Sequence, residues 1–455
     1  METQRLILDP VRETDKEDYF NNISYDRKVL ETFICKYAET LEGFDFSGYP
    51  GRKDILAIRL KETGRLIGIL TLFDDTDDVC EIGYSVGSGY WGKGYATEAI
   101  LRFLEYLFFE RGYQKVCASY FTGNEASRRV MEKCGMVWDH FSPKELTYLG
   151  AERDLTYYVI DRDTFAKPVF RHFQPGDYQA VCDFLTELNR EDRTHVNWNW
   201  ARFEWMYGHP EFDAGLLGSV GLWWVGSRVV GAAIYDMYFG EAFCGVLPEY
   251  ADLYPEVLRY AWEELRDGNG LGIAICDGNE AERSFALASG FSPAEQSETI
   301  LRIELDGTFS LKLPEGLRYA ELDPVADEKT LQWLFWQGFD HGEDRAAFEL
   351  EKQSPSRPRP HFDPRLSVSA ADESGEPVAL CGLWYLPETD YAYVEPVCTI
   401  PSWRGKGVGR AVLTEALERA RALGAKRAYV ISDQEFYRKL GFVFDRHYTF
   451  YWKKS

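Results

Sequence analysis

One short pattern constrains this chain more than any other, because it occurs twice. Near the carboxyl end, a β-branched run leads into an amphipathic helical pattern through Arg404-Gly405-Lys406-Gly407-Val408-Gly409-Arg410. Near the amino end, Trp91-Gly92-Lys93-Gly94-Tyr95-Ala96 stands in the same place between a strand pattern and a helix pattern. Glycine lets a backbone turn tightly and approach a ligand, and the unpaired N–H groups of a new helix attract anions. Each loop is therefore expected to grip a pyrophosphate, with Lys and Arg supplying positive charge.

Both loops resemble the acyl-coenzyme A loop of the GNAT acetyltransferase superfamily, whose pattern is Arg or Gln, two residues, Gly, one residue, then Gly or Ala. Arg404, Gly407 and Gly409 match it fully. Gly94 and Ala96 also match, but Trp91 replaces the Arg or Gln, a departure that resembles the branch acetylating the amino termini of ribosomal proteins. The resemblance implies acetyl-coenzyme A as co-substrate. It implies binding through Arg404, Gly405, Lys406, Gly407, Val408, Gly409 and Arg410, and through Trp91, Gly92, Lys93, Gly94, Tyr95 and Ala96.

Other interpretations of the glycines are open but weaker. Gly87-Ser-Gly89-Tyr-Trp-Gly92 satisfies G-x-G-x-x-G, a dinucleotide-binding fingerprint. No acidic residue ends a second strand about 20 residues further on, since Glu110 falls inside the helical pattern. The glycines could also serve only as strand-to-helix turns.

The length and net charge of the chain limit the number of domains and the kinds of partner. The 455 residues suffice for about three domains. The formal charge of −23 disfavours nucleic acid and anionic membranes as partners and favours a cationic acceptor. No apolar signal core or run of about 18 apolar residues occurs. The nine cysteines are scattered, and the histidines lack metal-ligand spacing. A cytoplasmic protein without disulfides or a metal centre is expected.

The order of strand and helix patterns predicts three tandem GNAT-type folds, each of α+β class with a mixed sheet. The expected bounds are 1–166, 167–310 and 311–455. The first and third units carry the loops. The middle unit has two carboxylates and two prolines over 246–255 instead, although the eleven-residue interval from Asn124 to Gly135 recurs from Asn279 to Gly290. It is interpreted as a degenerate GNAT fold without a cofactor loop.

Acetyl transfer to an amine needs a neutral amine, stabilisation of an oxyanion and a proton for the departing thiolate. In the third unit the resemblance implies Tyr437 as the acid. Backbone N–H groups around Val397 and Thr399 are expected to meet the acetyl group, because the fourth strand of this fold separates from the fifth. Glu395 is the candidate base. Core packing of Tyr437 and simple solvation of Glu395 remain open.

In the first unit, Glu81 is the candidate base and Ser127 the residue that hydrogen-bonds the thiol. Tyr84 and Val86 are expected to offer backbone contacts. Asn124 is expected to face the pantetheine arm, to cap a helix, or both.

The sequence thus predicts an N-acetyltransferase that moves the acetyl group of acetyl-coenzyme A to an amine of a small molecule or peptide. Direct attack in a ternary complex is expected, in a monomer or homodimer that binds neither nucleic acid nor membrane. Two alternatives stay open. The chain could bind acyl-coenzyme A without catalysis, as a sensor or scaffold, or only one of the two loop-bearing domains could be active.

Overall fold

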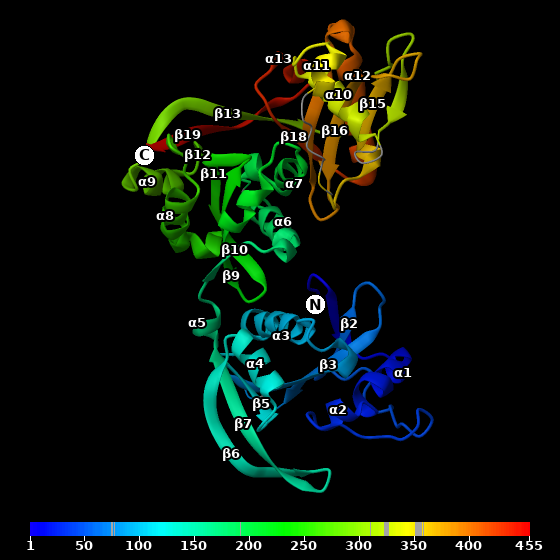
Figure 1. Ribbon diagram of the computed structural model, residues 1–455, viewed down its shortest axis with the longest axis vertical. Helices are drawn as coiled ribbons and strands as arrows, with labels where there is room; N and C mark the ends of the chain where they lie inside the picture. The colour runs from blue at the N-terminus through cyan, green and yellow to red at the C-terminus, as the bar shows by residue number, and fades with distance from the viewer. Residues whose placement is uncertain are drawn as a thin grey trace. The chain divides into compact units, whose positions relative to one another are not determined.

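The computed structural model describes all 455 residues except 74, 75, 77, 192, 310, 323–326, 351–356 and 358. The chain forms two compact units, which Figure 1 shows as ribbons. Unit 1 comprises Met1–Val169 with Trp224–Arg228, and unit 2 comprises Phe170–Trp223 with Val229–Ser455. Among the described residues, no helix has both the length and the apolar character that crossing a membrane requires.

Unit 1 is built on a seven-stranded sheet, as far as its residues are described, with the order β1-β2-β3-β4-β5-β7-β6. β1 to β4 form an antiparallel meander, β5 runs parallel to β4, and β6 and β7 form a long hairpin. Six consecutive residues of β3 are buried, as expected of a strand covered on both faces. The strands are β1 (Leu6–Pro10), β2 (Ile55–Leu60), β3 (Leu66–Phe73), β4 (Val79–Val86), β5 (Lys115–Phe121), β6 (Val137–Tyr148) and β7 (Ala151–Asp161). The helices are α1 (Lys16–Tyr19), α2 (Arg27–Leu30), α3 (Tyr95–Glu105), α4 (Glu125–Lys133) and α5 (Arg162–Phe165).

Unit 2 contains two folds that share one sheet. The described strands follow the order β14-β15-β16-β17-β18-β13-β19-β12-β11-β10-β9-β8. The strands are β8 (Val169–His172), β9 (Gly221–Val225), β10 (Arg228–Asp236), β11 (Tyr238–Val246), β12 (Gly270–Cys276), β13 (Ser292–Glu304), β14 (Arg318–Glu321), β15 (Ser367–Ala371), β16 (Pro377–Tyr385), β17 (Tyr391–Thr399), β18 (Arg427–Ile431) and β19 (Val443–Lys454). The helices are α6 (Tyr178–Leu188), α7 (Trp200–Gly208), α8 (Tyr254–Glu264), α9 (Glu280–Ala288), α10 (Glu328–Gly338), α11 (Arg345–Leu350), α12 (Val408–Leu423) and α13 (Glu435–Arg438).

The two folds of unit 2 exchange their last strands. β13, from the middle part of the chain, pairs with β18 of the C-terminal fold, and β19, from the end of the chain, pairs with β12 of the middle fold. The two exchanged strands also pair with each other, and Figure 1 shows them running side by side between the folds. In unit 1 the equivalent places are filled by the unit's own hairpin of β6 and β7. Each fold of unit 2 therefore needs a strand from the other to complete its sheet, and the boundary expected near 310 falls inside one compact unit.

Local sequence explains the main helices. α12 buries residues three and four apart, including Val408, Val412 and Ala416, against the sheet, and it ends at Gly424 in the left-handed conformation that caps helices. α4 and α9 begin in the same way, because the side chains of Asn124 and Asn279 each accept a hydrogen bond from the backbone N–H three residues later. The repeated interval in the sequence is thus a repeated helix start.

Candidate functional site

In both loop-bearing folds, the strand that precedes the loop separates from its parallel neighbour. The ladder between β4 and β5 covers Val79 to Ile82, and the one between β17 and β18 covers Tyr391 to Tyr393. Beyond those points the described strands diverge, so their backbone N–H and C=O groups become available to a ligand. The expectation that the fourth strand separates from the fifth is confirmed.

The two loops follow one geometry. In unit 1 a 3₁₀ turn over Ser88–Tyr90 leads to α3, and in unit 2 a 3₁₀ turn over Pro401–Trp403 leads to α12. The residue before each helix is a glycine with positive φ, +80° at Gly94 and +83° at Gly407, where other side chains strain the backbone. A Cβ added at Gly407 would meet no protein atom within 4 Å, so the loop face above it is open. Both helix starts can therefore receive an anion directly on their N–H groups.

The first residue of each motif ties the loop to the end of the strand. The Trp91 indole Nε1 donates to the Val86 carbonyl oxygen at 2.6 Å, and the Arg404 Nε donates to the Thr399 carbonyl oxygen at 2.9 Å. Each donor lies five residues after the carbonyl that it binds. Trp91 thus makes the hydrogen bond that Arg404 makes, which accounts for its presence at this position.

The cations of the C-terminal loop differ in what they contact. Arg404 also donates to the Gly338 carbonyl oxygen and forms an ion pair with Asp340, both at 2.8 Å. Its charge is therefore compensated by the protein. The exposed Lys406 lies over the Trp403 ring at 4.6 Å from the centroid, and the exposed Arg410 forms no ion pair with any residue that the structure describes. Lys406 and Arg410 are the groups whose charge is available to phosphates.

Unit 1 holds a cavity of about 340 Å³ between the loop, the end of β4 and α4. This volume lies in the range of small-molecule sites, about 300–1,000 Å³. The predicted residues that line it are Tyr84, Val86, Trp91, Gly92, Gly94, Tyr95, Ala96, Asn124 and Ser127. Lys93 and Glu81 are not among the lining residues. Sequence reasoning missed the cations Arg129 and Lys133, although their spacing of four residues on the helix after Asn124 was a usable signal.

Two hydroxyl groups meet in this cavity. The Tyr84 hydroxyl and Ser127 Oγ lie 2.6 Å apart in a hydrogen bond that either can donate. Burial raises the pKa of Tyr84, which keeps its proton in place. Asn124 caps α4 through the Ser127 N–H. Glu81 lies where β4 is still paired with β5, and its carboxylate accepts a 2.7 Å hydrogen bond from Ser119 Oγ.

In unit 2 the candidate base lies on the separated part of β17. Glu395 accepts a 2.7 Å hydrogen bond from the Tyr393 hydroxyl, and its main-chain oxygen accepts one from the Trp384 indole at 2.8 Å. Burial raises the pKa of Glu395, while the charge of Arg202 and the Tyr393 hydrogen bond oppose the rise. The pairing of β17 with β16 shifts register at this point. A Cβ on Gly382 would lie 2.7 Å from the main-chain oxygen of Glu395. A carboxylate with a raised pKa is suited to accept a proton near neutral pH.

Tyr437 lies in α13 with 8% of its surface exposed. Its ring packs between Phe436 and Phe442, with centroid distances of 4.9 and 5.6 Å. Burial, followed by the charges of Cys381 and Glu395, raises the pKa of its phenol. Its hydroxyl makes no hydrogen bond with the residues that the structure describes. Tyr437 is therefore a core residue whose hydroxyl keeps its proton and is bound by no described residue.

The middle fold repeats the path of the chain without the glycine turn. β11 pairs with β12 at Glu241 and then separates from it, and a 3₁₀ turn over Pro248–Leu253 runs directly into α8. Glu249 and Asp252 stand near the helix start where the other folds place cations. These carboxylates would repel a pyrophosphate.

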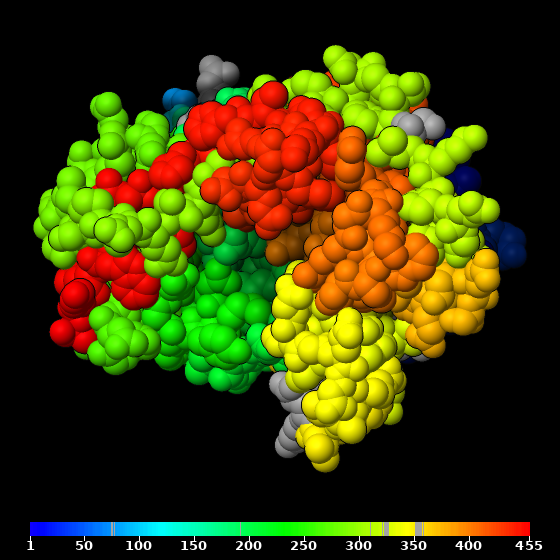
Figure 2. Space-filling view, turned by 90° about the horizontal axis from the view of Figure 1, so that it is seen from above, coloured from blue at the N-terminus to red at the C-terminus, as the bar shows by residue number. Residues whose placement is uncertain are grey.

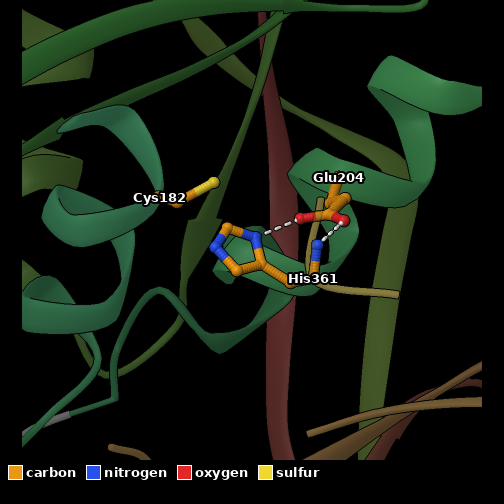
Figure 3. Close-up of side chains that lie close together, drawn as sticks. All are labelled: Cys182, Glu204 and His361. Carbon is orange, nitrogen blue, oxygen red and sulfur yellow. Dashed lines mark hydrogen bonds and ion pairs between the residues drawn. The ribbon is translucent and has the colours of Figure 1, made fainter. Parts of the chain in front are cut away.

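One buried group of possible metal ligands occurs among the described residues of unit 2. Donor atoms of Cys182, Glu204 and His361 lie within 4.8 Å of one another, and Figure 3 shows the Glu204 carboxylate facing His361. Glu204 accepts hydrogen bonds from the backbone N–H of His361 at 2.7 Å and from its Nδ1 at 2.5 Å, and the pKa of His361 is raised as a result. Glu204 and His361 thus form an ion pair that connects the segment around His361 to α7.

A separated strand followed by a glycine turn at a helix start places free strand-edge groups beside an anion site on an α+β sheet. Comparison with known families agrees. Residues 5–137 match the acetyltransferase (GNAT) domain, and residues 329–442 match the acetyltransferase (GNAT) family. The chain is therefore a tandem-domain member of the GNAT acetyltransferases, whose co-substrate is acetyl-coenzyme A.

Relatives from Bacillus subtilis match parts of the chain. The uncharacterised protein YkkB is 42% identical over 85 residues, which are 18% of this chain and 48% of YkkB. The uncharacterised N-acetyltransferase YoaA is 28% identical over 169 residues, which are 35% of this chain and 95% of YoaA. YdaF, provisionally named a ribosomal N-acetyltransferase, is 33% identical over 99 residues, which are 21% of this chain and 54% of YdaF. The matched stretch thus spans about half of two of these relatives.

A solved structure of a GNAT-family acetyltransferase from Bacillus anthracis is 25% identical, with a TM-score of 0.33, and covers 36% of this chain and 98% of its own. The GCN5-related N-acetyltransferase from Sphaerobacter thermophilus is 16% identical, with a TM-score of 0.42, and covers 64% of this chain and 96% of its own.

Proposed function

We propose that the chain transfers the acetyl group of acetyl-coenzyme A to an amine and holds two co-substrate sites. One site lies in unit 1 and the other in the C-terminal fold of unit 2. The observation that carries the proposal is the repeated combination of a separated strand with a left-handed glycine, Gly94 or Gly407, at a helix start. Each combination provides free strand-edge groups for an acyl chain beside an anion site for a pyrophosphate.

In the C-terminal fold, the backbone N–H groups around Val397 and Thr399 hold the acetyl carbonyl oxygen. Glu395 accepts the proton of the attacking amine, and Tyr437 gives a proton to the departing sulfur. Gly405, Lys406, Gly407, Val408, Gly409 and Arg410 hold the phosphates, while Arg404 shapes the loop. The Tyr437 hydroxyl, which no described residue binds, supports the role of acid, whereas its raised pKa makes the phenol a weaker proton donor.

In unit 1, the residues lining the cavity hold the co-substrate, with Trp91 in the loop-shaping role of Arg404. Tyr84 and Val86 offer the edge of β4, and Asn124 faces the pantetheine arm. Ser127, with Tyr84 behind it, provides a proton path to the sulfur. Glu81 is proposed as the base of this unit.

The acceptor is proposed to be an amine of a small molecule or peptide, handled by a monomer or homodimer in the cytoplasm. The nine cysteines are all free of disulfides, which fits a reducing compartment. We further propose that the middle fold is a degenerate GNAT fold, and that the three folds span 1–166, 167–310 and 311–455.

The position of Glu81 favours a second candidate function for unit 1. Because Glu81 does not line the cavity, unit 1 could bind co-substrate without turning it over.

Thiol release from acetyl-coenzyme A with pooled amines tests the activity, in the native chain and in Gly94→Glu and Gly407→Glu variants. Loss of all turnover in Gly407→Glu alone assigns unit 1 to binding. Saturable binding without any thiol release in the native chain would contradict the proposed enzyme.

A further inference from the structure

The middle fold places a charged cluster beside the C-terminal site. Arg202 of α7 donates to Asp236 at 2.7 Å and to Glu298 of β13 at 3.1 Å. Its guanidinium also lies 5.5 Å from the centre of the Trp198 ring. The three charged side chains keep only 15–20% of their surface exposed, so they interact in partly dry surroundings.

Two more carboxylates belong to this cluster. Glu241 lies on β11 of the middle fold, and Glu395 lies on β17 of the C-terminal fold. Glu241 accepts a 2.9 Å hydrogen bond from Gln296, two residues before Glu298 on β13, and α7, which carries Arg202, contacts β17. Burial raises the pKa of Glu241 and of Glu395, and the charges of Asp236 and Glu298 raise it further while Arg202 opposes the rise. Arg202 forms ion pairs with two of the four acids, Asp236 and Glu298. The cluster therefore carries excess negative charge that a cation would relieve.

Two tyrosine hydroxyl groups adjoin the cluster, and of these only the Tyr448 hydroxyl is a buried atom. The Tyr437 hydroxyl makes no hydrogen bond with the described residues, and burial of the side chain, followed by the charges of Cys381 and Glu395, raises its pKa. The Tyr448 hydroxyl is buried and unbonded on a side chain that is 1% exposed, and Tyr448 pairs with Glu298 across the strands. A buried polar group without a partner destabilises the fold. Both hydroxyls are suited to contact a polar ligand held at this place.

The cluster joins the two folds of unit 2. Asp236, Glu241, Glu298 and Arg202 come from the middle fold, whereas Glu395 stands on the separated edge of β17. Trp200 of α7 also packs edge-on against Trp384, whose indole binds the Glu395 main chain. Figure 2 shows unit 2 hollowed where the green middle fold meets the orange and red C-terminal fold. The middle fold thus forms one wall beside the candidate base.

We propose that the middle fold supplies the acceptor subsite of the C-terminal domain, and that this subsite selects acceptors with a second positive charge. The inference rests on the acetyl transfer proposed for that domain. The second ammonium group lies among Asp236, Glu241 and Glu298, and the reacting amine faces Glu395. A nitrogen–carbon bond forms as the carbon–sulfur bond breaks, the amine proton passes to Glu395, and the sulfur takes the Tyr437 proton.

Two probes that differ in one charge test this subsite. Butylamine and 1,4-diaminobutane have the same carbon chain, but only the diamine carries the second ammonium. The full chain with Gly94→Glu, which removes the unit 1 co-substrate site, is titrated with each amine by calorimetry and assayed for thiol release. We expect the diamine to bind about 10-fold more tightly or better, the effect of one charged hydrogen bond.

Glu298→Gln then removes one carboxylate while keeping its shape, and Asp236→Asn does the same on the neighbouring strand. Each should weaken diamine binding about 10-fold and leave butylamine unchanged. Glu263→Gln, on the exposed face of α8, is the matched control and should change neither.

Equal affinity for the two amines, no binding of either, or an unchanged preference in Glu298→Gln and Asp236→Asn would overturn the subsite. Selective diamine binding without thiol release at saturating acetyl-coenzyme A would leave the subsite standing and contradict the proposed transfer instead. A melting temperature equal to that of the native chain shows that a variant is folded.

Discussion

The junction after β17 and the junction after β11 follow the same path with different residues. In each, a 3₁₀ turn starts two residues after the strand, at Pro401 or Pro248, and a helix follows. The C-terminal junction has a left-handed glycine and free cations at the helix start, whereas the middle junction has carboxylates and a second proline. Buried residues of the sheet and helix preserve the path in both. Co-substrate binding depends on a few loop residues that can be lost without loss of the fold.

The largest expected effect comes from separating the two folds. A chain of residues 311–455 lacks β13 and leaves β18 with an unpaired edge, so it should not fold as a monomer. A chain of residues 170–455 retains both exchanged strands and should fold. Circular dichroism with analytical ultracentrifugation measures both chains. A cooperative melt from monomeric 311–455 would show that the exchange is dispensable.

The next effect concerns acid catalysis in the C-terminal fold of unit 2. Tyr437→Phe keeps the ring packing and removes the proton donor, so kcat should fall about 10–100-fold while the affinity for acetyl-coenzyme A stays nearly constant. Single-turnover transfer in the Gly94→Glu background measures the step. Tyr451→Phe, a buried tyrosine of β19, is the control. Equal single-turnover rates in Tyr437→Phe and the native chain would mean that Tyr437 only packs in the core.

A third prediction concerns the charge that the middle fold lends to the base. Arg202 lowers the pKa of Glu395, whereas Asp236 and Glu298 raise it. Arg202→Gln should therefore raise the pKa of Glu395, and because the base acts when ionised, the acidic limb of kcat/KM should move to higher pH. Arg259→Gln breaks an exposed ion pair on α8 and should leave the pH profile of kcat/KM unchanged. A shift of the acidic limb to lower pH, or no shift, would mean that Arg202 does not lower the pKa of Glu395.

The smallest effect compares the two working loops. Trp91→Gln can still donate to the Val86 carbonyl, so it should weaken acetyl-coenzyme A binding in unit 1 by less than about 3-fold. Trp91→Ala loses the hydrogen bond and should weaken binding about 2–10-fold. Calorimetry in the Gly407→Glu background measures both. Similar losses in the two variants would mean that the indole acts by its size.

Much of the frame followed from local patterns. The strand and helix patterns around the carboxyl-terminal loop coincide with β17 and α12, and those around the amino-terminal loop coincide with β4 and α3. The separation of β17 from β18 followed from the resemblance. β6 was missed because most of its residues are exposed, which leaves no apolar alternation to detect.

The exchange of β13 and β19 could not be predicted from the sequence. Each strand has the pattern of an ordinary closing strand, and nothing local shows which sheet it enters. The cluster around Arg202 was missed because its members are far apart in the chain, and Glu298 joins them on the exchanged strand β13. The roles assigned to Glu81, Ser127, Glu395 and Tyr437 remain predictions.

The central claim is that two of the three strand-to-helix junctions bind acetyl-coenzyme A. Calorimetric titration of the full chain tests it most directly. We expect about two equivalents in the native chain, about one in Gly94→Glu or Gly407→Glu, and none in the double variant, because a glutamate adds strain and repulsion at each pyrophosphate site. Gly268→Glu, in an exposed turn with open space around it, should keep both sites. Three equivalents in the native chain, or binding that survives the double variant, would contradict the account.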